Sequence, residues 1–335
     1  MSSSVWRGAL LLTAAAVGVK IMSAAYRIPF QNLAGDLGFY VYQQIYPFFA
    51  AALFLAAYGF PAALSKVVSE HISEHPNEGA GTLFARSFFI LSLFSVVVFA
   101  FLYYGTSWIS AAMGDSRLIA PLRAVSFSFL FIPLIAAVRG FLQGHGKMGP
   151  TAVSQLFEQS VRAGLIIGFA WLAFVKGFGS YFTGKLAAIG SVAGLAASCL
   201  ILIAYMIRHR SFLMQGASIS FSRLGKVLLY DGLIYSFSSM MLIFCLLIDT
   251  VTVVPLLQTD PLNAMRLMGI YDRGYPLVQL CTAAALSFSL AFVPALAKAN
   301  KHGDLAFVRE KSGQAVKVCT AFGSAAALGF AILAP

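Results

Sequence analysis

Three basic residues lie inside stretches of sequence that are otherwise almost entirely apolar. Lys20 and Arg27 fall in the first apolar segment, and Arg273 falls in a later one beside Gly274. A charge in the hydrocarbon of a bilayer costs at least about 2.5–3.5 kcal/mol, so such residues normally face an internal cavity or a partner. The sequence therefore predicts a membrane protein with a cationic interior.

Lys20 and Arg27 are seven residues apart, two helical turns, so both project from one face of the first helix. An arginine near a helix end can instead extend to the membrane surface, and Arg27, close to Pro29, is open to that alternative. Lys20 lies in the middle of its segment. We therefore expect the pair to face a cavity.

A polar stripe follows on a later helix, made of Gln155, Glu158, Gln159 and Arg162. Glu158 and Arg162 are four residues apart, a spacing that allows an ion pair within one helix. Two roles stay open for this stripe: it lines the interior of the protein, or it contacts a ligand directly.

Two acids complete the set of candidate residues. Asp249 is a lone acid in an apolar segment, which fits a proton or cation site, a counterion for Arg273, or an acid at the membrane surface. Asp272 precedes Arg273 and could satisfy it locally. Gly274 and Pro276 weaken the helix here, and broken helices at membrane depth are tolerated where they line a cavity or pack against protein.

The remaining reactive side chains form no catalytic or metal-binding pattern. The four cysteines are far apart in apolar runs, and the five histidines fall in expected loops without zinc spacing. The glycine-rich run 139–147 lacks the spacing of a nucleotide-binding loop, so Arg139 is expected in a tight, basic, cytoplasmic turn. We predict a transporter, not an enzyme, with no cofactor.

Composition supports the membrane assignment. The 335 residues are 59% hydrophobic and only 10% charged, whereas soluble proteins are typically about 25% charged. The net charge of +11 reflects bases concentrated in alternate loops, which predicts a cytoplasmic N-terminus. No nucleic-acid partner is expected.

Apolar segments long enough to span a bilayer follow one another along the chain. They are expected at about 5–29, 38–66, 83–104, 118–143, 151–175, 183–207, 224–255, 264–297 and 315–335. We expect residues 1–208 to form an N-lobe of six transmembrane helices, 209–222 a basic cytoplasmic linker, and 223–335 a C-lobe of about three helices that is incomplete.

Several motifs in order resemble the polysaccharide-exporter branch of the MOP flippase superfamily, in particular the stage V sporulation protein B group, which is related to the lipid II flippase MurJ. The motifs are Lys20 to Pro29, Gly35-Asp36-Leu37-Gly38-Phe39-Tyr40, Gly59 to Lys66, Arg139-Gly140-Phe141-Leu142-Gln143-Gly144, Ser154 to Arg162, and Tyr271-Asp272-Arg273-Gly274.

This resemblance implies an all-α integral membrane fold with two pseudo-symmetric lobes around a central cationic cavity. Arginines of the first and eighth helices bind the substrate's pyrophosphate in MurJ-like proteins, and Arg27 and Arg273 occupy the matching motifs, with Lys20 approximately so. The implied activity is alternating-access flipping of a lipid-linked oligosaccharide across the bacterial cytoplasmic membrane, among membrane lipid and with H⁺ or Na⁺ as a possible coupling ion.

Two other functions stay open. A MATE-like exporter of organic cations would share the fold but should carry acids in the N-lobe cavity. A non-transporting scaffold for envelope or spore assembly would need no charged cavity at all.

Overall fold

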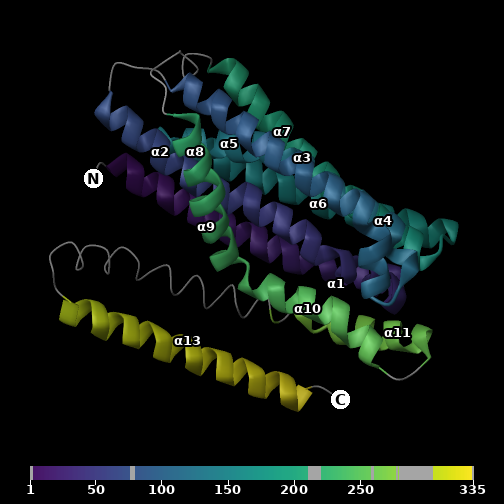
Figure 1. The fold of residues 1–335 in the computed structure, drawn as a ribbon. Helices are drawn as coiled ribbons and strands as arrows, with labels where there is room; N and C mark the ends of the chain where they lie inside the picture. The colour runs from purple at the N-terminus through teal and green to yellow at the C-terminus, as the bar shows by residue number, and fades with distance from the viewer. Residues whose placement is uncertain are drawn as a thin grey trace.

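The computed structural model describes residues 3–75, 80–209, 220–257, 260–276, 278 and 305–333, and every regular element within those ranges is a helix. The all-α prediction is therefore confirmed. Most of the helices run roughly along one common direction, and α13 (Leu305–Leu333) lies to one side of the others (Figure 1).

The first element, α1 (Ser3–Phe54), is a helical hairpin and not one rod. Gly35 has φ 67° and ψ 178°, a conformation that is open to glycine and strained for other residues. The hydroxyl groups of Tyr26 and Tyr42 lie 2.5 Å apart, whereas 16 residues of straight helix would separate them by about 24 Å. The chain therefore reverses at Gly35, where the sequence predicted the break between the first two spans.

The second arm of the hairpin continues through a π-helical turn, Leu55–Gly59, into α2 (Phe60–Glu74). The next span is α3 (Gly81–Ala112). The fourth is divided into Ser116–Leu118, α4 (Ile119–Ser126), Phe127–Phe131 and α5 (Ile132–Gly144). Then come α6 (Gly149–Lys176) and α7 (Ser180–Arg208). The fourth to sixth spans agree with the predicted bounds within three residues, whereas the second and third end eight residues later than predicted. We call α1 to α7 the N-terminal bundle.

Proline and glycine set the ends of these helices. Pro133 and Pro150 lie in the first turn of α5 and α6, where a missing N–H costs nothing. Gly177 takes a left-handed conformation directly after α6 and ends it. The helices of the bundle then pack on one another through α1, α6 and α7 and through α2 and α5.

The C-terminal helices are α8 (Phe221–Lys226), a π-helical turn Val227–Asp231, α9 (Gly232–Ser239), α10 (Met241–Leu256) and α11 (Pro261–Asp272). Helices α8 to α10 cover the predicted span 224–255, but the chain bends by 73° between α9 and α10, which the sequence did not indicate. Ser238 and Ser239 donate hydrogen bonds to the carbonyls of Ile234 and Tyr235, a contact that often bends helices.

The rest of the predicted span 264–297 lies largely outside the described residues, as do residues 210–219 of the predicted linker. The division into an N-lobe, a linker and a C-lobe remains a prediction.

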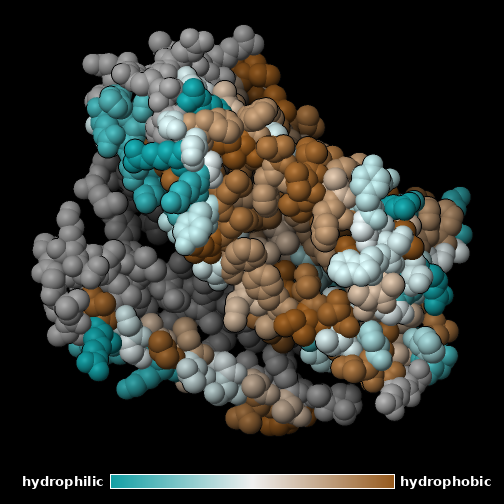
Figure 2. Space-filling model, in the orientation of Figure 1, coloured by the Kyte–Doolittle hydropathy of each residue, from teal (hydrophilic) through white to brown (hydrophobic). Residues whose placement is uncertain are grey.

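The surface and the helix lengths together define a multi-pass membrane protein. Figure 2 shows hydrophobic residues across the middle of the visible face and hydrophilic residues toward its two ends. Among the residues that the structure describes, five helical runs are long and apolar enough to cross a membrane, or six with the bent pair. The first run, of 64 residues, contains the Gly35 hairpin and so supplies two spans.

Candidate functional site

Arg27 is the most deeply buried base of the predicted site. Its exposed fraction is 0%, and its guanidinium carbon lies 4.3 Å from the ring centre of Tyr46 and 5.2 Å from that of Tyr275. A guanidinium over an aromatic face is stabilised by the negative charge of that face. Tyr46 belongs to the second arm of the α1 hairpin, and Tyr275 follows α11. Arg27 therefore lies where the N-terminal bundle meets the C-terminal helices.

An aromatic wall within the α1 hairpin fixes the position of Arg27. Phe30 packs edge-on against Tyr42, with ring centres 5.0 Å apart, and Tyr42 contacts Tyr46. The hydrogen bond between Tyr26 and Tyr42 joins the two arms next to Arg27. Such packed rings restrict the Arg27 side chain to few rotamers.

Arg273 has a different partner from the two acids, Asp272 and Asp249, that the sequence suggested. It forms an ion pair with Asp36, at the turn of the α1 hairpin, and not with Asp272 or Asp249. The Arg273 and Asp36 side chains are 44% and 35% exposed, so this pair lies at the margin of the protein. The structure thus does not place the guanidinium groups of Arg27 and Arg273 in one cluster.

The other predicted residues lie at intermediate depths. Lys20 is half-buried on α1, seven residues before Arg27. Asp272 is 3% exposed at the end of α11, and the charges of Asp249 and Arg27 act on it. Asp249 is partly buried on α10. Two acids and one base therefore lie near one another between α1, α10 and α11.

A second buried charged group joins α5, α6 and α7, and we call it the Arg139 network. Arg139, at 0% exposure, donates hydrogen bonds to Glu158 at 3.0 Å, Ser198 at 2.8 Å and Ser154 at 3.1 Å. The expectation that Arg139 lies in a cytoplasmic turn is therefore wrong. The count of basic residues in alternate loops placed Arg139 in a loop. The signal that could have indicated its burial is the presence of serines, Ser154 and Ser198, on the helices that face it.

The glycines beside Arg139 explain how it becomes buried. A Cβ atom at Gly140 would lie 2.8 Å from the Cβ of Leu64, and one at Gly144 would lie 2.6 Å from the Cβ of Val68. Because both positions lack a side chain, α5 approaches α2 closely. This packing covers one side of α5, while Arg139 contacts α6 and α7 on another.

The predicted polar stripe of α6 is part of this network. Arg162 lies 3.8 Å from Glu158, as the four-residue spacing predicted, and it also donates a hydrogen bond to Gln159. Its guanidinium lies over the ring of Phe49, 4.9 Å from the centre. Gln155 is half-buried on the same helix. Two arginines share one carboxylate, so the network carries an excess of one positive charge.

Within the described residues, no group of three or more His, Cys, Asp or Glu side chains could hold a metal ion.

The fold is similar to that of solved transporters of the MOP superfamily. An inward-facing multidrug resistance MATE family transporter of the MOP superfamily superposes with a TM-score of 0.71 over 94% of this chain and 69% of its own, at 15% identity. A MOP superfamily transporter from Pyrococcus furiosus, described as having a binding pocket of reverse polarity, superposes with a TM-score of 0.57 over 96% of this chain and 76% of its own, at 18% identity.

Residues 5–300 match the family model described as "Polysaccharide biosynthesis protein", and the chain belongs to this family. The resemblance to the polysaccharide-exporter branch of the MOP superfamily is therefore confirmed.

Three relatives from Bacillus subtilis (strain 168) are similar in sequence. The uncharacterized membrane protein YabM is 36% identical over 97% of this chain and 62% of its own length. The lipid II flippase MurJ is 25% identical over 99% of this chain and 65% of its own length. Stage V sporulation protein B is 28% identical over 58% of this chain and 38% of its own length. The chain thus spans less than two thirds of each of these relatives.

Proposed function

We propose that this protein is a flippase that moves a lipid-linked oligosaccharide of the undecaprenyl-diphosphate type, such as lipid II or another cell-wall polysaccharide precursor, across the bacterial cytoplasmic membrane. The observation that carries the proposal is the burial of Arg27 between Tyr46 and Tyr275, at the junction of the N-terminal bundle and the C-terminal helices. Similarity to MurJ and to stage V sporulation protein B supports it.

The chemistry of Arg27 suits a diphosphate. A diphosphate and a sugar head do not enter hydrocarbon without groups that replace their hydration. A guanidinium offers a rigid fork of N–H donors that matches two phosphate oxygens at once. In this proposal Arg27 binds the diphosphate, and Lys20 and Arg273 approach it when the two halves of the protein rearrange. The lipid tail stays in the bilayer.

Movement across the membrane would follow from alternating access. One half of the protein rocks against the other and exposes the binding site first to one side and then to the other. Asp272 and Asp249 are acids near Arg27, and they would bind a coupling ion, H⁺ or Na⁺.

The charge of the interior favours this function over export of organic cations. Glu158 is the buried acid of the polar stripe, and both Arg139 and Arg162 surround it. The excess charge there is positive, and Arg27, on α1 of the same bundle, adds another positive charge, whereas Asp249 and Asp272 lie on the C-terminal helices α10 and α11. An organic cation would be repelled by the charges that the N-terminal bundle contributes. A scaffold would gain nothing from buried cations whose desolvation is costly.

The test is transport by the full-length protein in proteoliposomes that contain a fluorescent undecaprenyl-diphosphate oligosaccharide. We expect Arg27→Ala to lose transport while the protein remains folded and abundant, and Arg27→Lys to retain an intermediate rate, because lysine supplies the charge without the fork. Arg208→Ala, at the end of α7 and exposed to solvent, is the matched control. Transport by Arg27→Ala at the wild-type rate would overturn the proposal.

A further inference from the structure

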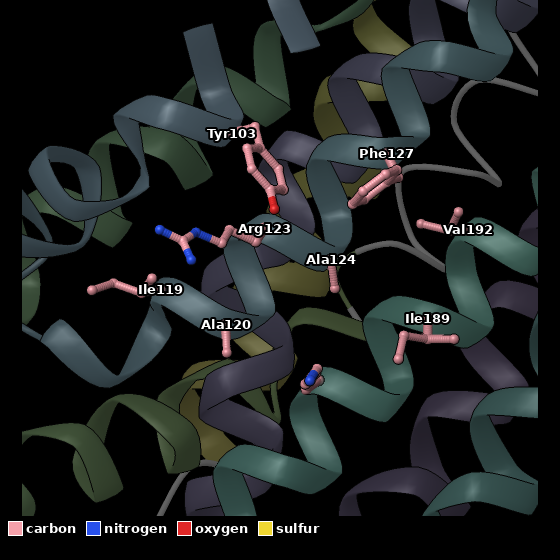
Figure 3. A pocket seen from close by; sticks show the side chains of 9 residues that line it. Tyr103, Ile119, Ala120, Arg123, Ala124, Phe127, Ile189 and Val192 are labelled. Atoms are coloured by element: carbon pink, nitrogen blue, oxygen red, sulfur yellow. The ribbon is translucent and has the colours of Figure 1, made fainter. Parts of the chain in front are cut away.

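A cavity of about 500 Å³ lies on the side of the N-terminal bundle, between α3, α4 and α7. It is separate from the site around Arg27, and none of its nine lining residues belongs to that site. Figure 3 shows Tyr103 of α3 and Arg123 of α4 on one side of it, with Ile189 and Val192 of α7 on the other. The cavity opens on the outer surface of the helices.

Two cations, Arg123 and Lys185, line this cavity. Arg123 lies over the ring of Tyr103, 5.5 Å from its centre, and its Nε donates a hydrogen bond to Thr106 at 3.4 Å. None of the lining residues is acidic. In the described part of the chain, neither Arg123 nor Lys185 forms an ion pair. The cavity therefore offers positive charge to an anion.

On the inner side of each cation, the wall of the cavity is apolar. Phe127 follows Arg123 by four residues, and Ile189 follows Lys185 by four, so each apolar residue lies one turn beyond its cation on the same helix face. Both helices run inward from the same end of the bundle, where α4 and α7 begin. The apolar part of the wall is therefore closer to the middle of the membrane than the cations.

The depth of the cations matches the headgroup region of a bilayer. Lys185 lies five residues from the start of α7, and Arg123 lies seven residues after Ser116, so each is about 7–10 Å from the helix end. Exposed aromatic residues surround this end, namely Trp108 at 71%, Phe178 at 45% and Phe182 at 43%. Aromatic belts of this kind mark the membrane interface.

From this arrangement we infer that the cavity binds one anionic phospholipid from the leaflet at this end of the protein. Its headgroup phosphate lies between Arg123 and Lys185, and one acyl chain runs along Phe127, Ile189 and Val192. Basic pockets between transmembrane helices suit anionic headgroups. The inference concerns the lateral surface of the bundle and does not depend on the proposed transport function.

The test is native mass spectrometry of the delipidated full-length protein, titrated with phosphatidylglycerol, phosphatidylcholine or inorganic phosphate. We expect phosphatidylglycerol to bind in preference to phosphatidylcholine. Arg123→Gln and Lys185→Gln should each weaken its binding about fivefold, and together about thirtyfold, since a cation near an anionic lipid contributes about 1 kcal/mol. Inorganic phosphate at equal concentration should not displace the lipid.

A control pair and a blocking variant separate a site from diffuse surface charge. Lys176→Gln with Arg266→Gln removes the same charge from exposed positions that do not line the cavity. Ala120→Phe keeps both cations but fills the cavity from an exposed lining position, so we expect it to weaken binding while leaving the protein monodisperse. Equal loss in the control pair, unchanged binding in Ala120→Phe, or equal affinity for the two lipids would overturn the inference.

Discussion

Arg273 and Asp36 form an ion pair that joins the end of α11 to the turn of the α1 hairpin. The pair connects the segment that carries Tyr275 to the segment that carries Arg27. Since both side chains are more than one third exposed, its contribution to stability is small, about 0–1 kcal/mol. Because it joins α1 to the end of α11, the pair is a place to test the proposed movement of the N-terminal bundle against the C-terminal helices.

We expect Asp36→Asn and Arg273→Ala to leave membrane abundance near that of the wild type, because the pair is exposed. Arg273→Ala should abolish transport if Arg273 later contacts the diphosphate, and the charge swap Asp36→Arg with Arg273→Asp should not restore it. Abundance and transport are measured on the same membranes. Recovery of transport by the swap would instead assign the pair a purely structural role.

Substitutions in the Arg139 network should lower the stability of the protein more than substitutions of Asp36 or Arg273. Glu158→Gln leaves both Arg139 and Arg162 without a counterion in a buried place, and we expect a loss of about 3–5 kcal/mol in the free energy of unfolding. Arg139→Met should cost less, because Glu158 keeps Arg162 at 3.8 Å. The free energy of unfolding is measured on the purified protein. Lys176→Gln, at an exposed position, is the control and should change that free energy by almost nothing.

The double variant Arg139→Met with Glu158→Gln provides the sharper comparison. It leaves one buried cation unpaired where Glu158→Gln leaves two, so it should be more stable than Glu158→Gln alone. If the two losses simply add, the network does not act as a unit.

A close contact at Gly269 should control the approach of α11 to the α1 hairpin. A Cβ atom at this position would lie 3.0 Å from the carbonyl carbon of Asp36 and 3.2 Å from the Cβ of Tyr40. Gly269→Leu should therefore separate the two segments and expose Met265, which is 2% exposed. The maleimide labelling rate of Met265→Cys in the purified protein should rise at least severalfold. Gly168→Leu, which has open space around it, should leave the rate unchanged.

The orientation of the chain is testable with single cysteines, after Cys199, Cys245, Cys281 and Cys319 are replaced. A cytoplasmic N-terminus places Phe178, after α6, outside the cell and Lys147, before α6, inside. An impermeant maleimide should label Phe178→Cys in intact cells, and Lys147→Cys only after permeabilisation. Ser211→Cys should behave like Lys147→Cys. The reverse pattern would contradict the predicted topology.

Much of the fold could be predicted because each span is set by local chemistry. Hydrophobic length located the spans of the N-terminal bundle, with end points that differ from the observed ones by at most eight residues. Gly35 marked the hairpin because its turn needs a residue that tolerates positive φ. The bend between α9 and α10 was not predicted. Ser238 and Ser239 bond to carbonyls of the preceding turn, but the sequence does not distinguish such serines from other polar residues.

The site was predicted less completely, because side-chain partners depend on packing between distant segments. Spacing alone predicted the contact of Glu158 with Arg162. Spacing could not predict the pairing of Arg273 with Asp36, because these residues are 237 positions apart in the sequence. Nor could it predict the burial of Arg139, whose partner Ser198 is 59 positions away. The aromatic neighbours of Arg27 were missed for the same reason.

The Arg139 network also bears on how the chain enters the membrane during synthesis. α5 emerges first with Arg139, and α6 follows with Glu158 after the short connection 145–148. Arg139 lies five residues before the end of α5, so an isolated α5 would carry its charge at a lower cost than the about 2.5–3.5 kcal/mol of an arginine at the bilayer centre. We expect α5 to insert with Arg139 toward the membrane surface and to bury it when α6 brings Glu158, with Ser198 of α7 closing the network last.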